Sequence, residues 1–236
     1  MKAPVICIDG PAASGKTTIA KILADRLGYF YLDTGVLYRA VTWVAIGKGI
    51  EPSDGEELAE LAAKVTIEVK AAPPGDPRQT IVIADGDDVS LAIRSPQVDA
   101  NVSEVSAHAD VRTALIGVQR SVADKGGVIL AGRDAGTVVW PEAEVKVYLV
   151  ASEEERARRR QKQAEIQGIT VDFATVLAEL RRRDAYDSGR AVAPLRAAAD
   201  AVVIDTTSLS IDQVVEKVLE VFQQNTGLHV AHPGGA

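Results

Sequence analysis

The chain has 236 residues, of which 47% are hydrophobic and 25% charged, and its formal net charge is −7. This is ordinary globular composition for a protein with one main hydrophobic core, and the negative charge argues against general binding to nucleic acid. No run approaches the roughly 20 apolar residues of a membrane-spanning helix, and the N-terminus lacks the pattern of a signal peptide. We therefore expect a cytoplasmic protein without a membrane partner. The single cysteine, Cys7, has no partner in the chain for a disulfide.

Short apolar strands and amphipathic helices alternate through the first third of the chain. The pattern predicts, in order, a strand at 5–9, a glycine-rich turn, a helix at 17–27, a strand at 29–32 and a helix at 35–48. Ser53 and Glu56 then form a capping-box pattern, which predicts Ser53 as the N-cap of the next helix.

Residues 65–94 differ in character from the segments on either side. Polar and apolar residues alternate at 66–70 and, loosely, at 79–84, and the connection at 72–77 is rich in turn-forming residues. Such alternation predicts a small antiparallel sheet with one solvated face. We interpret this segment as an insertion into the main fold.

The remainder of the chain returns to alternating helices and strands. The expected elements are helices from Ser95–Pro96 and at 110–125, strands at 128–131 and 145–150, helices at 153–167 and 173–187, a strand at 202–205 and a helix at 211–222. Strands that alternate with helices imply a parallel sheet covered on both faces. The tail at 223–236 is polar and ends in Pro-Gly-Gly-Ala, so we predict that it is disordered.

Residues 10–17, Gly-Pro-Ala-Ala-Ser-Gly-Lys-Thr, match the phosphate-loop pattern G-x-x-x-x-G-K-S/T at every fixed position. Glycines let successive backbone N–H groups point at phosphate oxygens, and the following helix adds its positive dipole end. Lys16 is expected to reach the β- and γ-phosphates of ATP, and Thr17 to offer its hydroxyl to Mg²⁺. A chance match in a turn is the alternative, but the strand before the loop and the helix after it favour phosphate binding. The predicted ATP-binding residues of the loop are Gly10, Pro11, Ala12, Ala13, Ser14, Gly15, Lys16, Thr17 and Thr18.

Polar residues follow two predicted strands at the edge where parallel sheets bind ligands. Asp33 follows the strand at 29–32, and Arg133 and Asp134 follow the strand at 128–131. An arginine here can bind a phosphate through paired hydrogen bonds. The alternatives are a helix-dipole charge for Asp33 and a surface salt bridge for Arg133 and Asp134; the position in the chain favours a ligand site.

Arginines are concentrated between residues 156 and 190. Arg156, Arg159 and Arg160 share one face of a helix, and further arginines follow at 181–183 and 190. A solvated charged surface is the usual meaning of such runs. Two arginine-rich helices around residues 166–168 could also form a lid over the phosphates, because phosphoryl transfer depends on positioning and charge stabilisation. We expect Arg156 and Arg159 to contribute to ATP binding.

Together these motifs resemble the bacterial cytidylate kinase family over roughly residues 5–222. The most specific segments are Gly-Arg-Asp-Ala-Gly-Thr-Val-Val at 132–139 and Arg-Ala-Val-Ala-Pro-Leu at 190–195. The resemblance implies a three-layer α/β P-loop kinase fold with a five-stranded parallel sheet, a small mixed insertion in the acceptor domain and a short helical lid. The predicted divisions are a core at 1–34, 111–153 and 171–222, a CMP-binding region at 35–110 with its insertion near 65–94, a lid at 154–170, and the tail at 223–236.

The resemblance also implies an activity, the phosphorylation of CMP and dCMP by ATP with Mg²⁺ through direct in-line transfer. The implied CMP-binding residues are Ser103, Arg112 and Asp134 for cytosine, Arg183 and Asp187 for the ribose, and Thr34, Arg39, Arg133 and Arg190 for the phosphate. The implied catalytic residues are Lys16, Arg133, Arg190 and Asp33, with Asp33 ordering water around a metal held by Thr17.

Other functions remain open from the sequence. A P-loop kinase could act on UMP, AMP or shikimate, and a non-catalytic sensor would bind nucleotide without turnover. A kinase for nucleic-acid 5′ ends fits poorly with the net negative charge. The resemblance favours a monomer.

Overall fold

The computed structural model describes residues 2–73, 76, 78, 80–166 and 168–229. Its centre is a five-stranded sheet in the order β2-β6-β1-β7-β8, and every strand pairing within it is parallel. The strands are β1 (Val5–Asp9), β2 (Phe30–Asp33), β6 (Val128–Gly132), β7 (Val145–Val150) and β8 (Val202–Asp205). The predicted five-stranded parallel sheet is thus confirmed, with β2 shifted by one residue.

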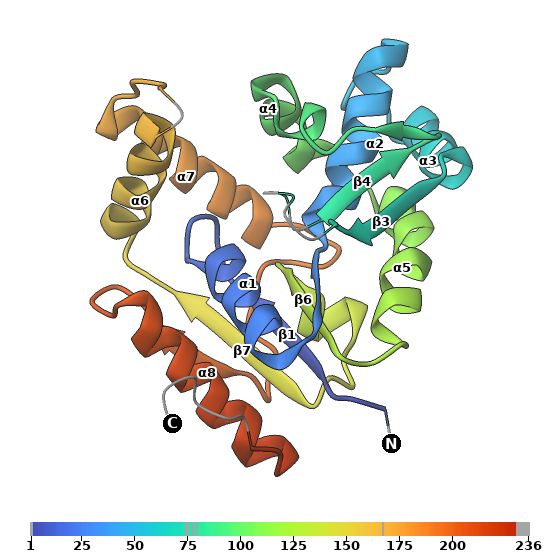
Figure 1. Ribbon diagram of the computed structural model, residues 1–236. Helices are drawn as coiled ribbons and strands as arrows, with labels where there is room; N and C mark the ends of the chain where they lie inside the picture. Colours follow the sequence, from blue (N-terminus) through green and yellow to red (C-terminus); the bar gives the residue numbers. More distant parts are fainter. Residues whose placement is uncertain (1, 74–75, 77, 79, 167, 230–236) are drawn as a thin grey trace.

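Helices cover both faces of this sheet (Figure 1). Ile6 and Ile8 of β1 pack on one side, in the same cluster as residues of α1 (Lys16–Leu27) and α8 (Ile211–Thr226). Val5 and Cys7 pack on the other side, with α2 (Gly35–Lys48) and α5 (Ala109–Ala123). Alternate side chains of one strand therefore enter two different cores, which explains why its sequence is apolar from Val5 to Ile8.

A second, three-stranded sheet lies beside α2 (Figure 1). It consists of β3 (Ile67–Ala71), β4 (Thr80–Ala84) and β5 (Asp87–Asp88), all paired antiparallel, as the alternating polarity predicts. Residues 74, 75, 77 and 79 of the predicted connection and second strand lie outside the described residues. The helices α3 (Gly55–Lys64) and α4 (Pro96–Val105) precede and follow this sheet in the chain, and the 3-10 turn η1 (Ala92–Arg94) leads into α4.

Two further helices, α6 (Glu153–Ile166) and α7 (Phe173–Ser188), pack on each other at one end of the molecule (Figure 1). Their contact is a small apolar cluster of Ala157, Val176 and Leu180. Ser152 accepts a hydrogen bond from the backbone N–H of Glu155, so the predicted N-cap of the arginine-rich helix is confirmed. Residue 167, at the predicted end of that helix, lies outside the described residues.

The predicted N-cap of α3 and part of the predicted disordered tail are wrong. Asp54, not Ser53, caps α3, because the helix begins at Gly55 and the Asp54 carboxylate accepts from the backbone N–H of Glu57 at 3.0 Å. At the other end of the chain, α8 continues to Thr226, so residues 223–226 are helical, contrary to the predicted disorder. Residues 230–236 of that tail lie outside the described residues.

Within the described part of the chain, no helix is both long enough and apolar enough to span a membrane.

Candidate active site

The phosphate loop joins β1 to α1, and its glycines meet specific steric demands. Gly10 has φ 150°, and a Cβ there would lie 2.2 Å from the carbonyl oxygen of Leu149, which no side chain can tolerate. Gly15 has φ 99° and precedes the first residue of α1. Because Gly15 caps this helix without a side chain, its first N–H groups are left for a ligand, and a helix N-terminus favours an anion.

Lys16 lies between the loop and the acidic side chains at the edge of the sheet. Its Nζ donates to the carbonyl oxygen of Pro11 at 2.6 Å. Burial and, after it, the charge of Arg133 lower the pKa of Lys16 to about 7, while Asp33 and Asp9 act in the opposite direction. The neutral amine form of Lys16 is therefore poised to gain a proton when negative charge enters the site.

This pKa predicts proton uptake when ATP binds. The triphosphate favours the charged form of Lys16 and raises its pKa above 7, so at pH 8.5 this residue binds more protons in the complex than in the free protein. Titration calorimetry at pH 8.5, in two buffers of different ionisation enthalpy, measures the uptake. We expect Lys16→Met to remove it; equal uptake by this variant would assign the proton to another group.

One cavity of about 780 Å³ connects the phosphate loop with the acceptor-side residues. Its lining comes from both ends of the predicted site: the loop from Ala12 to Thr18, Asp33, Thr34, Arg39, Arg112, Arg133, Asp134, Arg159, Arg183, Asp187 and Arg190. Gly10, Pro11, Ser103 and Arg156 were also predicted as site residues but do not line it. The cavity thus brings together residues more than 150 positions apart in the chain.

Arg156 has a different environment from Arg159, although both lie on α6. Its guanidinium is buried, where it donates to the Asp184 carboxylate at 2.5 Å and to the carbonyl oxygen of Ala12 at 3.2 Å. Arg156 therefore links the phosphate loop to α6 and α7. Arg159 lines the cavity, donating to Thr206 after β8 at 3.0 and 2.6 Å.

Asp187 organises two arginines on the acceptor side. Its carboxylate is only 1% exposed and accepts hydrogen bonds from Arg133 and, at 2.5 Å, from Arg190. Arg190 also donates to the Ser106 hydroxyl at 2.9 Å and to the Ser103 carbonyl oxygen at 3.4 Å. A single buried carboxylate thus holds two guanidinium groups at the edge of the cavity, where both could contact the same anion.

A second buried ion pair joins Arg112 of α5 to Asp134. Arg112 also donates to the carbonyl oxygen of Ser106 at 3.0 Å, and its guanidinium lies 5.1 Å from the centre of the Tyr38 ring. The Tyr38 hydroxyl in turn accepts from Gln119 at 3.3 Å. These contacts fix a charged donor and a charged acceptor side by side within the cavity wall.

Several buried donors in this cluster lack a hydrogen-bond partner within the described structure. They are the Nε atoms of Arg112, Arg183 and Arg190. Burial and, after it, the charge of Arg133 lower the pKa of Arg183 to about 10. Buried donors without partners are costly, and a strongly perturbed pKa in a cavity is typical of a ligand site. An anionic ligand would accept hydrogen bonds from these donors and would favour the charged form of Arg183.

A magnesium ion fits the loop side of the cavity in the manner of a nucleotide-bound metal. Within the described residues, no group of three or more His, Cys, Asp or Glu side chains could hold a metal. Mg²⁺, however, keeps several waters and takes only one or two protein oxygens besides the substrate phosphates. Thr17 and Asp33 both line the cavity, and one Asp33 oxygen accepts from the backbone N–H of Gly35 at 2.9 Å, which orients the carboxylate.

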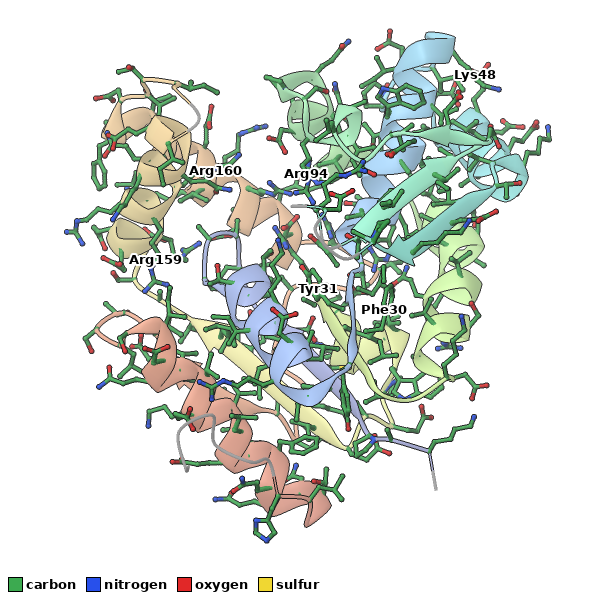
Figure 2. All side chains as sticks on the ribbon, viewed as in Figure 1. Phe30, Tyr31, Lys48, Arg94, Arg159 and Arg160 are labelled. Atoms are coloured by element: carbon green, nitrogen blue, oxygen red, sulfur yellow. The ribbon has the colours of Figure 1, made fainter. Side chains whose placement is uncertain are left out.

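Other cavity or near-cavity residues were not predicted from the sequence. Arg94 precedes α4 and lines the cavity, as does Arg160 of α6, and Figure 2 labels both. Ser106, one turn after the predicted Ser103, lines it as well. The signals were present, since Arg94 stands next to a helix start and Ser106 shares a helical face with Ser103, but neither signal separates a ligand residue from a surface one.

A phosphate loop at the carboxyl edge of a parallel sheet, facing clustered arginines across one cavity, is the arrangement of the P-loop phosphotransferases. A family model described as cytidylate kinase matches residues 6–224. The cytidylate kinase of Anoxybacillus flavithermus is 47% identical over 219 residues, which cover 93% of this chain and 96% of that protein. The cytidylate kinase of Bacillus subtilis is 45% identical, with coverage of 94% and 97%. The chain therefore belongs to the cytidylate kinase family.

Other similar proteins differ in length or in sequence. The bifunctional pantoate ligase/cytidylate kinase of Synechococcus elongatus is 47% identical over 93% of this chain, and the chain spans 42% of that protein's length. A solved structure of an uncharacterized protein from Eubacterium ventriosum matches with a TM-score of 0.52 at 15% identity, covering 94% of this chain and 99% of that one. This second likeness concerns the fold alone.

Proposed function

We propose that the chain transfers the γ-phosphoryl group of ATP to the phosphate of CMP or dCMP, forming ADP and the corresponding diphosphate. The observation that carries the proposal is the single cavity with a phosphate loop at one end and a buried arginine–aspartate cluster at the other. Membership of the cytidylate kinase family supports the same acceptor. Both ends must be occupied for transfer, and one cavity reaches both.

The base would lie against Arg112 and Asp134. Cytosine has an exocyclic amine that donates and a ring nitrogen and carbonyl that accept; a carboxylate and a guanidinium complement these groups. Ser103, predicted to contact the base, is displaced from the cavity lining, where Ser106 stands instead. We therefore assign the hydroxyl contact near the base to Ser106.

The acceptor phosphate would lie among Arg39, Arg133 and Arg190, with Thr34 beside them. Arg39 currently donates to Asp99 at 2.6 Å and to the carbonyl oxygen of Ile93 at 3.0 Å, which holds its guanidinium at the cavity edge. Arg183 and Asp187 of α7 would contact the ribose. In this arrangement the nucleotide phosphate meets arginines that Asp187 and Asp99 already position, so little ordering is required on binding.

Transfer would proceed in line between the two nucleotides without a covalent enzyme intermediate. A bound Mg²⁺, with Thr17 and Asp33 as its protein contacts, would supply charge neutralisation at the donor phosphates. Lys16 and the backbone N–H groups of the loop hold the donor phosphates, and Arg133 and Arg190 stabilise the negative charge that develops between donor and acceptor. We further propose that the protein acts as a monomer in the cytoplasm.

The first experiment measures ADP formation from ATP·Mg²⁺ with CMP, dCMP, UMP, AMP, GMP and shikimate as acceptors. We expect rapid turnover with CMP and dCMP and much slower turnover with UMP, because uracil places an acceptor opposite the Asp134 carboxylate. Preferential turnover of another acceptor would retain the kinase and contradict the cytosine site. ATP binding without turnover of any acceptor would instead indicate a nucleotide sensor.

A further inference from the structure

Asp9 lies at the junction of the two loops that form the cavity. It is the last residue of β1 and is followed directly by Gly10 of the phosphate loop. In the parallel pairing of β1 with β6, Asp9 is the partner of Gly132, which precedes Arg133 and Asp134. One residue therefore adjoins both the loop assigned to ATP and the loop assigned to the acceptor.

Both oxygens of the Asp9 carboxylate accept hydrogen bonds from the segment after β6, called here the acceptor loop because it carries Arg133 and Asp134, which are assigned to the acceptor nucleotide. The backbone N–H of Ala135 donates to Oδ1 at 2.9 Å, and that of Gly136 donates to Oδ2 at 2.7 Å. These are the two residues immediately after Asp134, and they begin the short helix η2 (Ala135–Val139). Asp9 is 4% exposed, so no bulk water replaces these bonds if the carboxylate is lost.

The hydrogen-bond partners of this buried carboxylate are backbone amides, unlike the charged side chain that completes a buried ion pair. Within the described structure no lysine or arginine forms a salt bridge with Asp9. Burial raises its pKa to about 6, whereas the Gly136 and Ala135 amides act to lower it. The compensation for burying this charge thus comes mainly from the backbone of the acceptor loop, which ties the position of that loop to the end of β1.

Packing leaves the start of η2 little freedom to adjust. A Cβ on Gly136 would lie 3.4 Å from Cβ of Cys7 and 3.3 Å from Cδ of Lys146, so the helix rests closely on β1 and β7. Asp9 itself is absent from the cavity lining. The charge of Asp9 raises the pKa of Lys16, but an effect of Asp9 on the choice of base must act through the residues that it holds.

We propose that Asp9 is a positioning residue, whose carboxylate holds the amides of Ala135 and Gly136 and thereby fixes Arg133 and Asp134 relative to the phosphate loop. This role rests on the proposed function, because it concerns the residues assigned to the acceptor. It makes the geometry of cytosine recognition dependent on a residue outside the cavity.

The test is Asp9→Asn, which keeps the size of the side chain and one acceptor oxygen but presents an NH₂ group to the second amide. We expect kcat/KM for CMP to fall about 10- to 100-fold, as for the loss of one buried hydrogen bond with an unpaired donor. UMP turnover should fall less, so the CMP-to-UMP ratio of kcat/KM should shrink about tenfold, while KM for ATP changes less than about threefold. Asp9→Ala, which removes both acceptors, should give a larger loss.

Arg120→Met is the matched control, because Arg120 holds the other end of the same short helix. Its side chain, on an exposed residue, donates to the carbonyl oxygens of Val139 and Val138, both at 3.0 Å. We expect this variant to keep the wild-type CMP-to-UMP ratio. CMP binding to each variant is also measured by calorimetry, and the stability of each by thermal unfolding. If Asp9→Ala fails to fold, the test rests on Asp9→Asn alone.

The outcomes separate this inference from the proposed function. If the wild-type protein turns over CMP and Asp9→Asn has the same CMP-to-UMP ratio of kcat/KM as the wild type, the positioning role is overturned and the proposed function stands. An equal loss of discrimination in Arg120→Met would also overturn it, because any loosening of the short helix would then suffice. A wild-type protein inactive with CMP would overturn both.

Discussion

Replacing Lys16 with methionine should lower kcat for phosphoryl transfer by at least about 1,000-fold. Lys16 is the only ammonium among the cavity-lining residues that the structure describes, and it begins the helix whose N-terminus faces the donor phosphates. Methionine preserves the length and apolar contacts of the side chain but removes its charge. The transferred group carries its negative charge on three oxygens in the transition state, so the loss falls mainly on the rate and less on substrate binding.

Steady-state ADP formation under saturating ATP·Mg²⁺ and CMP measures this effect. Lys21→Met is the matched control, since Lys21 lies on the same helix and outside the cavity lining. The control should retain wild-type kcat within about twofold, as is usual for changes away from packed or functional features. Comparable activity in Lys16→Met and wild type would contradict direct phosphoryl transfer on this loop.

The fold followed from the sequence because the strands and the loop have strong local signals. The run from Val5 to Ile8 is apolar on both faces, as a central parallel strand requires, and only Asp9 separates it from the phosphate-loop pattern. Helix ends were harder to predict. Ser53 and Asp54 are both good N-cap residues, and only the position of the helix start at Gly55 decides between them.

The end of α8 was missed because its stabilising contacts are not periodic. Apolar residues stop at Phe222, but Asn225 donates to the carbonyl oxygen of Glu144 at 3.0 Å, and Gly227 ends the helix in the left-handed conformation. The contact with Glu144 crosses 81 residues of sequence. A pattern confined to one helix does not contain it.

The membership of the site was easier to predict than the role of each residue. Spacing placed Arg156 and Arg159 on one helical face, yet Arg156 turns to Asp184 and Ala12, while Arg159 lines the cavity. Asp9 illustrates the same limit, because its partners at Ala135 and Gly136 are 126 and 127 residues away. Such pairings depend on which strands are neighbours in the sheet, and strand order is a property of the whole fold.

Replacing Asp134 with asparagine should reduce the preference for CMP over UMP by at least about 100-fold. A carboxylate can only accept hydrogen bonds, so it complements the amine of cytosine and leaves the O4 carbonyl of uracil facing another acceptor. Asparagine has nearly the same shape but offers an NH₂ group that can donate to this carbonyl. It also weakens the buried pair with Arg112, so kcat/KM for CMP should fall about 100-fold while that for UMP stays unchanged or rises.

The measurement is kcat/KM for both acceptors at saturating ATP, with Asp110→Asn as the control. Asp110 lies in the first turn of α5, on the same helix as Arg112, but is exposed and outside the cavity lining. Its replacement should leave the ratio unchanged. If Asp134→Asn lowered kcat/KM equally for CMP and UMP, Asp134 would serve to hold Arg112 rather than to contact the base. A rise in kcat/KM for UMP is not expected from that structural role alone, because it requires a new donor opposite the O4 carbonyl of uracil.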